Sequence, residues 1–506
     1  MIVNLSSQTI ALLGVVLSGL VFFGYAKRTV GHQTTLDGYL LADKSISGPE
    51  FANTFAVANV SLAGNLTFFV GAHRDYGYLM ALGPLLFVAI QWLVLAFVTK
   101  SPKQFLHIRS IADIWTSAFP GKGMARVIAG LCAWCCLMTV FVEILVGAEI
   151  LSVFLPEGGL YKAGTFLLLA LVVLAYVCYG GYKAIIKTDN WQLVLIFLAA
   201  AAMTLFAISA PALNQASPAT VVANLLTHQE SGWALACFVT WACLLNVFLA
   251  MTDISLWQRI AASASPQQAL KGFVQGLWKW VVVFVLPMLC FIALYLKGHH
   301  YNTMPEFLNL VLDQAGSLEI IVFPLIIVGF ISALFSTADT TLIAAMYALC
   351  DRHTFLPALE QIPAQQREKT LKRYLSLFTI ALSALLAGLY YLNHSEFGGL
   401  IIPLMYAAWG LICVTAPLIM VALYRVIKGL PPQSLSTGQK SLIMLGLVVS
   451  WGLVLISAYT GREVYEQLSL LVGAGIVYIT LMLAIYSDKI KALVEINPVS
   501  ITSQST

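Results

Sequence analysis

The chain has 506 residues, of which 60% are hydrophobic and only 10% are charged, and its formal net charge is +4. A mean hydropathy of +0.87 excludes a water-soluble globular protein, because so few charged residues cannot cover the surface of a soluble domain. The basic residues are spread over short segments between apolar runs, so the small net charge does not indicate a nucleic-acid partner. The composition predicts a protein of the plasma or inner membrane that is embedded in the lipid bilayer.

Apolar runs of roughly 20 residues recur along the whole chain, and this length crosses a hydrocarbon core about 30 Å thick. They predict thirteen transmembrane helices, at residues 8–26, 51–71, 79–99, 127–155, 160–180, 189–209, 232–252, 273–296, 319–350, 371–391, 398–424, 440–459 and 467–487. The segments between them are too short to form a soluble domain with its own core.

The loops between these helices alternate in positive charge. One set holds 22 Lys and Arg residues, whereas the opposite set holds only four. Because Lys and Arg are retained on the cytoplasmic side, the alternation supports the helix count. It also predicts an N-terminus outside the cell and a C-terminus inside.

The second predicted helix contains poor helix formers near its middle. Gly64 and Asn65 stand between the polar residues Ser61 and Thr67 in an otherwise apolar run. Two interpretations are open: a break that exposes peptide oxygens, or a seam of small residues that packs against a neighbouring helix. The seventh predicted helix has neither Gly nor Pro in its middle, so a break there has less support.

Ionisable side chains inside hydrocarbon are costly, and each is therefore a candidate for function. The predicted helices and their ends hold five carboxylates, Glu143, Glu149, Asp189, Asp253 and Asp339. No Arg is predicted deep in a helix, which argues against an ion pair with an anionic solute. No His lies deep in one either, which argues against an intramembrane enzyme.

The ninth predicted helix carries the segment FSTADTTL within an apolar run. Ser332, Ser336 and Thr340 repeat every four residues and share one face, and Asp339 lies beside them. Hydroxyl oxygens with one carboxylate suit a hard monovalent cation, provided that carbonyls of a broken helix complete the coordination. The alternative is that the hydroxyls only bond back to their own helix. The buried carboxylate favours the cation site.

The order of the predicted helices allows an inverted repeat, because two units of five helices would begin on opposite sides of the membrane. The predicted division has four parts. They are an extra N-terminal helix and loop at 1–50, a first five-helix unit at 51–209, a second at 232–424, and two C-terminal helices with a short tail at 425–506.

Five segments, in order between about residues 37 and 420, together resemble the sodium/solute symporter family. They are DGYLLADKSI, HIRSIADIWTSAFP, GGYKAIIKTDNWQ, TDISLWQRIAASASPQQALKG and ISALFSTADTTL. The family includes sodium/galactose, sodium/proline and sodium/sialic acid carriers. The resemblance implies an all-α core of two inverted five-helix units with broken helices, and alternating access driven by the Na+ gradient.

The resemblance also implies a main sodium site. Its ligands would be the hydroxyls of Ser336 and Thr337 and the carbonyl of Ala333, with carbonyls of the broken helix near Ser61 and Gly64.

A second cation is implied near Asp189, Asp339 and Thr340, as in some relatives. From the residues alone, Asp189 is interpreted instead as a helix N-cap. A carboxylate at position 339 is more acidic than the hydroxyl-rich family pattern, so either a second cation or a proton is open here.

Three amides are the candidate solute ligands. Asn246 matches a polar contact of the sugar carriers. Asn65 and Gln91 are candidates to face the cavity, and the alternative for each is an amide that packs between helices. The aromatic gate expected three residues after Asn246 is replaced by Leu249, which argues against a sugar.

The sequence therefore predicts a sodium-coupled symporter, not an enzyme, for a small neutral or zwitterionic organic solute such as a sugar or an amino acid. Na+ is the expected coupling ion. Two alternatives stay open: proton coupling in the same fold, and a transporter-like receptor that binds the solute without turnover.

Overall fold

The structure is a computed structural model, and it describes residues 6–29, 35–67, 69–70, 82–100, 110–155, 159–213, 232–350, 364–393 and 401–496. Within these segments the secondary structure is helical, apart from one backbone bridge between Ile46 and Ser263. The all-α prediction is therefore confirmed.

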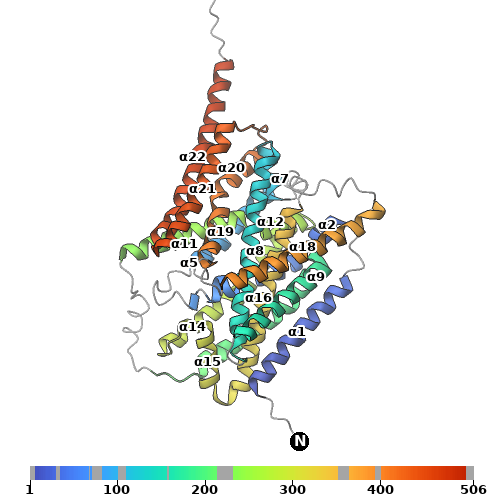
Figure 1. The fold of residues 1–506 in the computed structure, drawn as a ribbon, viewed down its shortest axis with the longest axis vertical. Coiled ribbons are helices and arrows are strands. Elements are labelled where there is room, and N and C mark those ends of the chain that lie inside the picture. Colours follow the sequence, from blue (N-terminus) through green and yellow to red (C-terminus); the bar gives the residue numbers. More distant parts are fainter. Residues whose placement is uncertain are drawn as a thin grey trace, which may run out of the picture.

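Figure 1 shows the described helices, coloured in chain order. They are α1 (Ser7–Thr29), α2 (Leu36–Leu41), α3 (Gly48–Ala58), α5 (Leu82–Lys100), α7 (Ile111–Ala118), α8 (Lys122–Ser152), α9 (Gly159–Ser209), α11 (Gly232–Thr252), α12 (Ile254–Ala262), α13 (Pro266–Trp280), α14 (Leu286–Leu296), α15 (Met304–Gln314), α16 (Glu319–Leu349), α18 (Ala364–Asn393), α19 (Ile401–Val414), α20 (Ala416–Ile427), α21 (Thr437–Thr460) and α22 (Glu463–Ile496).

In the described part of the chain, ten helical stretches are long and apolar enough to cross a bilayer. Three differences separate this number from the predicted thirteen. The predicted helices at 160–180 and 189–209 continue into each other as α9, the one at 51–71 is interrupted, and the one at 371–391 has an apolar part of only Ser376–Leu392. The count of thirteen, the orientation and the division into repeats stay predictions.

The helix predicted at 51–71 is broken, which agrees with the first of the two interpretations, a helix break rather than a packing seam. α3 begins with a capping box between Ser47 and Glu50 and ends at Ala58. A π-helical segment, η3 (Leu62–Thr67), follows after a short irregular stretch. The break lies one turn before Gly64. There the side-chain amide of Asn59 donates to the Phe55 carbonyl at 2.8 Å and so competes with the backbone N–H groups of the helix for this acceptor.

A second break separates α11 from α12, where the sequence offered less support for one. Asp253 leaves the helical conformation, with φ −61° and ψ 100°, and its side chain accepts from the amide of Ser255. The sequence-based expectation of an unbroken helix took only Gly and Pro in the middle of a helix as signs of a break. Here an N-cap aspartate ends one helix and begins the next, which requires neither residue.

The long helix α9 changes direction at Gly181. This residue has φ 59° and ψ −165°, a conformation that other residues rarely adopt. The hydroxyl of Tyr39 donates to the carbonyl of Val177 at 3.0 Å and so fixes α2 beside the turn. The turn separates the two predicted helices of this region and sets the direction of the second one.

Helix α16 lies at the centre of the molecule, where it packs against α1, α8 and α9 (Figure 1). Glycines allow these close approaches. A Cβ added at Gly329 would lie 2.1 Å from the Cβ of Ala199 on α9, and one at Gly147 of α8 would lie 2.0 Å from Leu334 Cδ1. Small residues are the usual means by which membrane helices come close.

This packing makes a prediction for Gly329. We expect Gly329→Ala to lower the thermal unfolding temperature measurably, because the new methyl group also meets the Leu195 carbonyl at 2.9 Å, and overpacking costs about 1–3 kcal/mol. Gly130→Ala on α8 is the matched control, since a Cβ there would have no neighbour within 4 Å. Melting curves of the purified protein in detergent would test it, and equal curves for both variants would contradict it.

Candidate functional site

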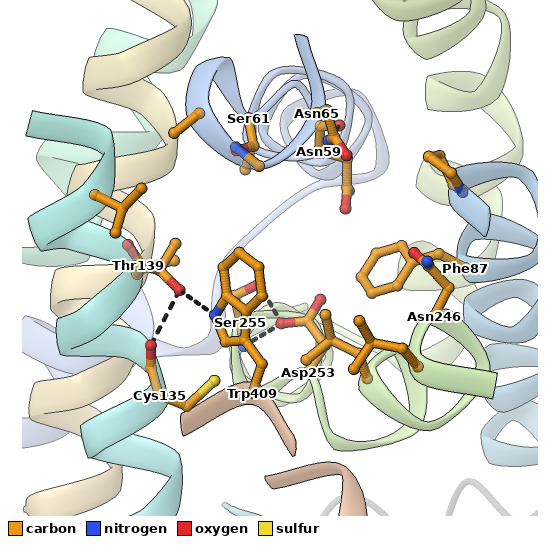
Figure 2. A pocket seen from close by; sticks show the side chains of 18 of the residues that line it. Asn59, Ser61, Asn65, Phe87, Cys135, Thr139, Asn246, Asp253, Ser255 and Trp409 are labelled. Carbon is orange, nitrogen blue, oxygen red and sulfur yellow. Dashed lines mark hydrogen bonds between the residues drawn. The ribbon is translucent and has the colours of Figure 1, made fainter. Parts of the chain in front are cut away.

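A cavity of about 460 Å³ lies between the two broken helices. Figure 2 shows polar groups of both breaks facing it, with Ser61, Asn59 and Asn65 on one side and Asp253 and Ser255 on the other. Aromatic and aliphatic side chains from α5, α8, α11, α14 and α19 form most of the remaining wall. A largely apolar cavity with a few polar groups is the usual form of a small-molecule site.

At the first break, a buried carboxylate from α8 holds the irregular backbone. Glu143 is 1% exposed, and it accepts hydrogen bonds from the Ser61 hydroxyl and, at 3.3 Å, from the Ala63 amide. The amide of Gly64 donates in turn to the Ser61 hydroxyl at 2.6 Å. The side chain of Ser61 is therefore directed to α8.

The carbonyl of Ser61 is also occupied in this conformation. It accepts from the amides of Asn65 and Leu66 at 3.3 and 3.2 Å. Carbonyls at the end of α3 accept hydrogen bonds as well: that of Phe55 from the Asn59 side chain at 2.8 Å, and that of Val57 from the Val60 amide at 3.1 Å. A ligand role for the carbonyls of Ser61 and Gly64 stays a prediction.

At the second break, the carboxylate of Asp253 accepts from three donors. One oxygen accepts from the amide and the hydroxyl of Ser255 at 2.9 and 2.6 Å, and the other accepts from the side chain of Gln91 at 2.8 Å. The guanidinium of Arg259, which is 1% exposed, contacts the Ser255 hydroxyl at 3.2 Å. Arg259 of α12 is thus deeply buried, whereas the sequence predicted no Arg deep in a helix.

A second cluster of oxygens lies between α9 and α16, and we name it the α9–α16 oxygen cluster. Ser336 donates to Asp189 at 2.9 Å, and the Tyr176 hydroxyl donates to Asp339 at 2.6 Å. Ser336 and both carboxylates are 0% exposed. Two members of the predicted second site, Asp189 and Asp339, therefore lie with Ser336 of the predicted main sodium site.

Several buried atoms of the α9–α16 oxygen cluster have no hydrogen-bond partner. They are one oxygen each of Asp189 and Asp339, the hydroxyls of Thr337 and Thr340, and both amide atoms of Gln192. Leaving buried polar groups unpaired costs free energy, and native proteins satisfy nearly all of them. Atoms of this kind, with several oxygens among them, fit a site for a desolvated cation or a proton.

The α9–α16 oxygen cluster has more acidic groups than basic ones. Asp189 and Asp339 supply two carboxylates, and the guanidinium of Arg259 is close enough to Asp189 for an electrostatic interaction. Arg259 cannot balance both acids. One further positive charge at the cluster would neutralise it, and a monovalent cation or a proton supplies that charge.

No protein-family model matches the chain. The sodium/pantothenate symporter of Haemophilus influenzae is 26% identical over 414 residues, which is 76% of this chain and 80% of that protein. Among solved structures, a Na+-coupled sialic acid symporter in a substrate-bound outward-open state covers 93% of this chain and 96% of its own, with a TM-score of 0.70 at 14% identity. A nucleobase-cation-symport-1 family transporter in a closed conformation covers 88% and 93%, with a TM-score of 0.54 at 12% identity.

In sequence the chain is similar to a sodium/pantothenate symporter, and in fold it is similar to a Na+-coupled sialic acid symporter. The protein is accordingly a multi-pass membrane protein, and the proteins it resembles carry the names of transporters rather than of enzymes.

The fold separates the predicted solute ligands from one another. Asn65 and Asn246 line the cavity, and Asn246 also donates to the Ala242 carbonyl of its own helix at 2.8 Å. Leu249 lines the cavity at the position of the expected aromatic gate. Gln91 is fully buried and contacts Asp253, so it lies behind the wall rather than in it.

The predicted cation ligands of α16 lie away from the cavity wall. Ala333, Ser336, Thr337 and Thr340 are buried within the helix packing, while Thr341 of the same helix does line the cavity.

Several polar groups of these sites could not be assigned from the sequence. Tyr176 and Gln192 carried no signal, because a tyrosine and an amide in helices are common. Glu143 and Asp253 were recognised as costly carboxylates but were not assigned a role.

Proposed function

We propose that this chain is a sodium-coupled symporter that moves a small organic solute across the membrane by alternating access. The observation that carries the proposal is the α9–α16 oxygen cluster, in which buried carboxylates and hydroxyls leave several oxygens unpaired. The relatives support Na+ as the coupling ion, since two of them are named as sodium symporters.

The cation would bind between α16 and its neighbours. Ser336 and Asp189 supply two oxygens 2.9 Å apart, and the unpaired hydroxyls of Thr337 and Thr340 supply two more. Hard cations prefer such oxygen ligands. α16 also contacts both α3 and η3, so the Ala333 carbonyl and carbonyls at the end of α3 are the proposed ligands of a site at the first break.

Coupling in this proposal is thermodynamic. Na+ must bind the solute-competent conformation more tightly than the others, because a ligand that binds all conformations equally shifts none of them. The breaks in the helices provide backbone that can change without unfolding a continuous helix.

A proton is the second candidate for the coupling ion. The hydrogen bond between Tyr176 and Asp339 places a hydroxyl on a carboxylate inside the same cluster. Chains of such groups serve as proton relays in membrane proteins.

The test is transport in proteoliposomes with a Na+ gradient and a pH gradient imposed separately, together with direct binding of radioactive Na+ to the purified protein. The solute panel contains pantothenate, sialic acid, glucose, proline and choline. We expect Na+ binding, and uptake of at least one solute that follows the Na+ gradient. Uptake that follows only the pH gradient would establish the proton alternative, and absence of both Na+ binding and gradient-driven uptake would refute symport.

Ser336 gives a matched pair of variants for the ion site. We expect Ser336→Ala to weaken Na+ binding about three- to tenfold, because it removes an oxygen that contacts Asp189. Ser332→Ala, one turn earlier, should leave Na+ binding unchanged, since the Ser332 hydroxyl donates only to the Val328 carbonyl of its own helix at 2.7 Å. Titration with radioactive Na+ measures both, and an equal affinity in the two variants would argue against the placement.

A further inference from the structure

Asp253 bears on the charge that the solute carries. Its carboxylate lines the cavity on the side of the second helix break, beside Ser255 (Figure 2). All three groups that hydrogen-bond to it, from Ser255 and Gln91, are donors without a charge. Its negative charge therefore has no cationic partner in direct contact in the described part of the chain.

The cavity wall offers no other compensation. Two carboxylates line it, those of Asp253 and Glu149, and no Lys, Arg or His is among its described lining residues. Arg259, the nearest buried cation along the chain, contacts the Ser255 hydroxyl that donates to Asp253, and the two charged groups are not in direct contact. The described lining residues therefore carry negative charge and no positive charge.

Aromatic rings surround the same space. Trp241, Trp280, Trp409 and Phe87 line the cavity. In Figure 2 the rings of Trp409 and Phe87 lie to either side of Asp253. The faces of such rings attract ammonium groups electrostatically.

The indole N–H groups of two tryptophans are already used by the protein. Trp409 donates to the Thr139 hydroxyl at 3.2 Å, and Trp280 donates to the Asn59 carbonyl at 3.3 Å. These rings are therefore held in place, and they offer π surface to a ligand rather than hydrogen-bond donors.

We propose that the solute carries an organic ammonium group, which is held by the carboxylate of Asp253 and the aromatic rings around it. This rests on the proposed function and narrows it, because a zwitterion or an organic cation fits the site and a simple anion does not. An anionic solute without an ammonium group would face the carboxylate of Asp253, which has no cation in direct contact in the described part of the chain. A neutral solute would leave the negative charge of Asp253 without a counter-ion.

The test measures binding and uptake by the full-length protein with Na+ present. The probes are choline, ethanolamine and putrescine, each at equal concentration, against 3,3-dimethylbutanol as the neutral isostere of choline and pantothenate and sialic acid as anions. We expect at least one ammonium compound to bind about tenfold more tightly than the neutral isostere and both anions, which is about 1.4 kcal/mol. Equal binding of the neutral isostere, tighter binding of an anion, or no binding of any ammonium compound would each overturn the proposal.

Variants of Asp253 provide a second, independent readout. Asp253→Asn should reduce the affinity for the ammonium compound at least tenfold, while Asp253→Glu should retain most of it. Asp313→Asn on α15 makes the same change of charge at an exposed position outside the cavity wall, and it should have no effect. Unchanged affinity in Asp253→Asn overturns the proposal.

The two proposals fail in different ways. Na+-driven uptake of a neutral or purely anionic solute would refute the ammonium proposal and leave symport standing. Absence of Na+ binding and of uptake driven by either gradient for every solute, with an ammonium compound still bound, would refute symport alone.

Discussion

Replacing Asp189 with Asn is expected to raise the Na+ concentration for half-maximal uptake about a hundredfold, which corresponds to ~3 kcal/mol. Asn retains an oxygen that can accept from Ser336, so the packing of α9 against α16 should persist. What it removes is one full negative charge beside the bound cation. Two unit charges 4 Å apart at a protein site of effective dielectric constant near 20 attract by about 4 kcal/mol, so the loss should be large.

The measurement is the Na+ dependence of initial uptake in proteoliposomes, with a thermal melting curve to show that the variant folds. Asp313→Asn again serves as the control for the change of charge alone. A wild-type Na+ dependence in a well-folded Asp189→Asn protein would remove the α9–α16 oxygen cluster from the coupling mechanism. Loss of a response to pH, with the Na+ response intact, would assign the cluster to protons.

Glu143→Ala is expected to have the largest effect on the first break. Glu143 accepts hydrogen bonds from Ser61 and Ala63, and a hydrogen bond to a charged group contributes about 1.5–3 kcal/mol. Without the carboxylate, the Ser61 hydroxyl and the Ala63 amide lose their partner inside the protein. We expect a lower unfolding temperature and at least a tenfold loss of Na+-driven uptake.

Glu143→Gln separates the two effects. The amide oxygen of Gln can still accept one of these bonds, so the unfolding temperature should recover most of the way to the wild-type value. If Glu143→Ala melts and transports like the wild type, then η3 does not depend on this carboxylate for its position.

Much of the helical framework could be predicted from the sequence, because hydrophobic length is a local property of the chain. The same holds for the polar face of α16 that we propose to bind the ion. Ser336 and Asp339 are three residues apart, and helical periodicity alone places them side by side. The break in the second predicted helix was also within reach, although its position near Asn59 depends on a side chain that bonds to its own backbone.

Contacts between helices could not be predicted from the sequence, because they depend on the arrangement of the whole fold and not on a local property of the chain. Tyr176 and Asp189 lie on the two sides of the turn at Gly181, and only the direction of that turn brings both to α16. Gln91 was expected in the cavity because it is an amide in an apolar helix, but the rotation of α5 directs it to Asp253 instead. No periodicity within one helix specifies such a rotation.

Helix α16 has one further consequence for how an ion gradient is converted into movement of the solute. Ser336 and Asp339 belong to the α9–α16 oxygen cluster, whereas Thr341 of the same helix reaches the cavity. Ser336 and Thr341 are separated by a rise of only about 7.5 Å along the axis, at 1.5 Å for each residue. A small rotation of α16 as a rigid body would therefore change the α9–α16 oxygen cluster and the cavity wall at the same time. Coupling between the two sites then needs no long chain of side-chain contacts.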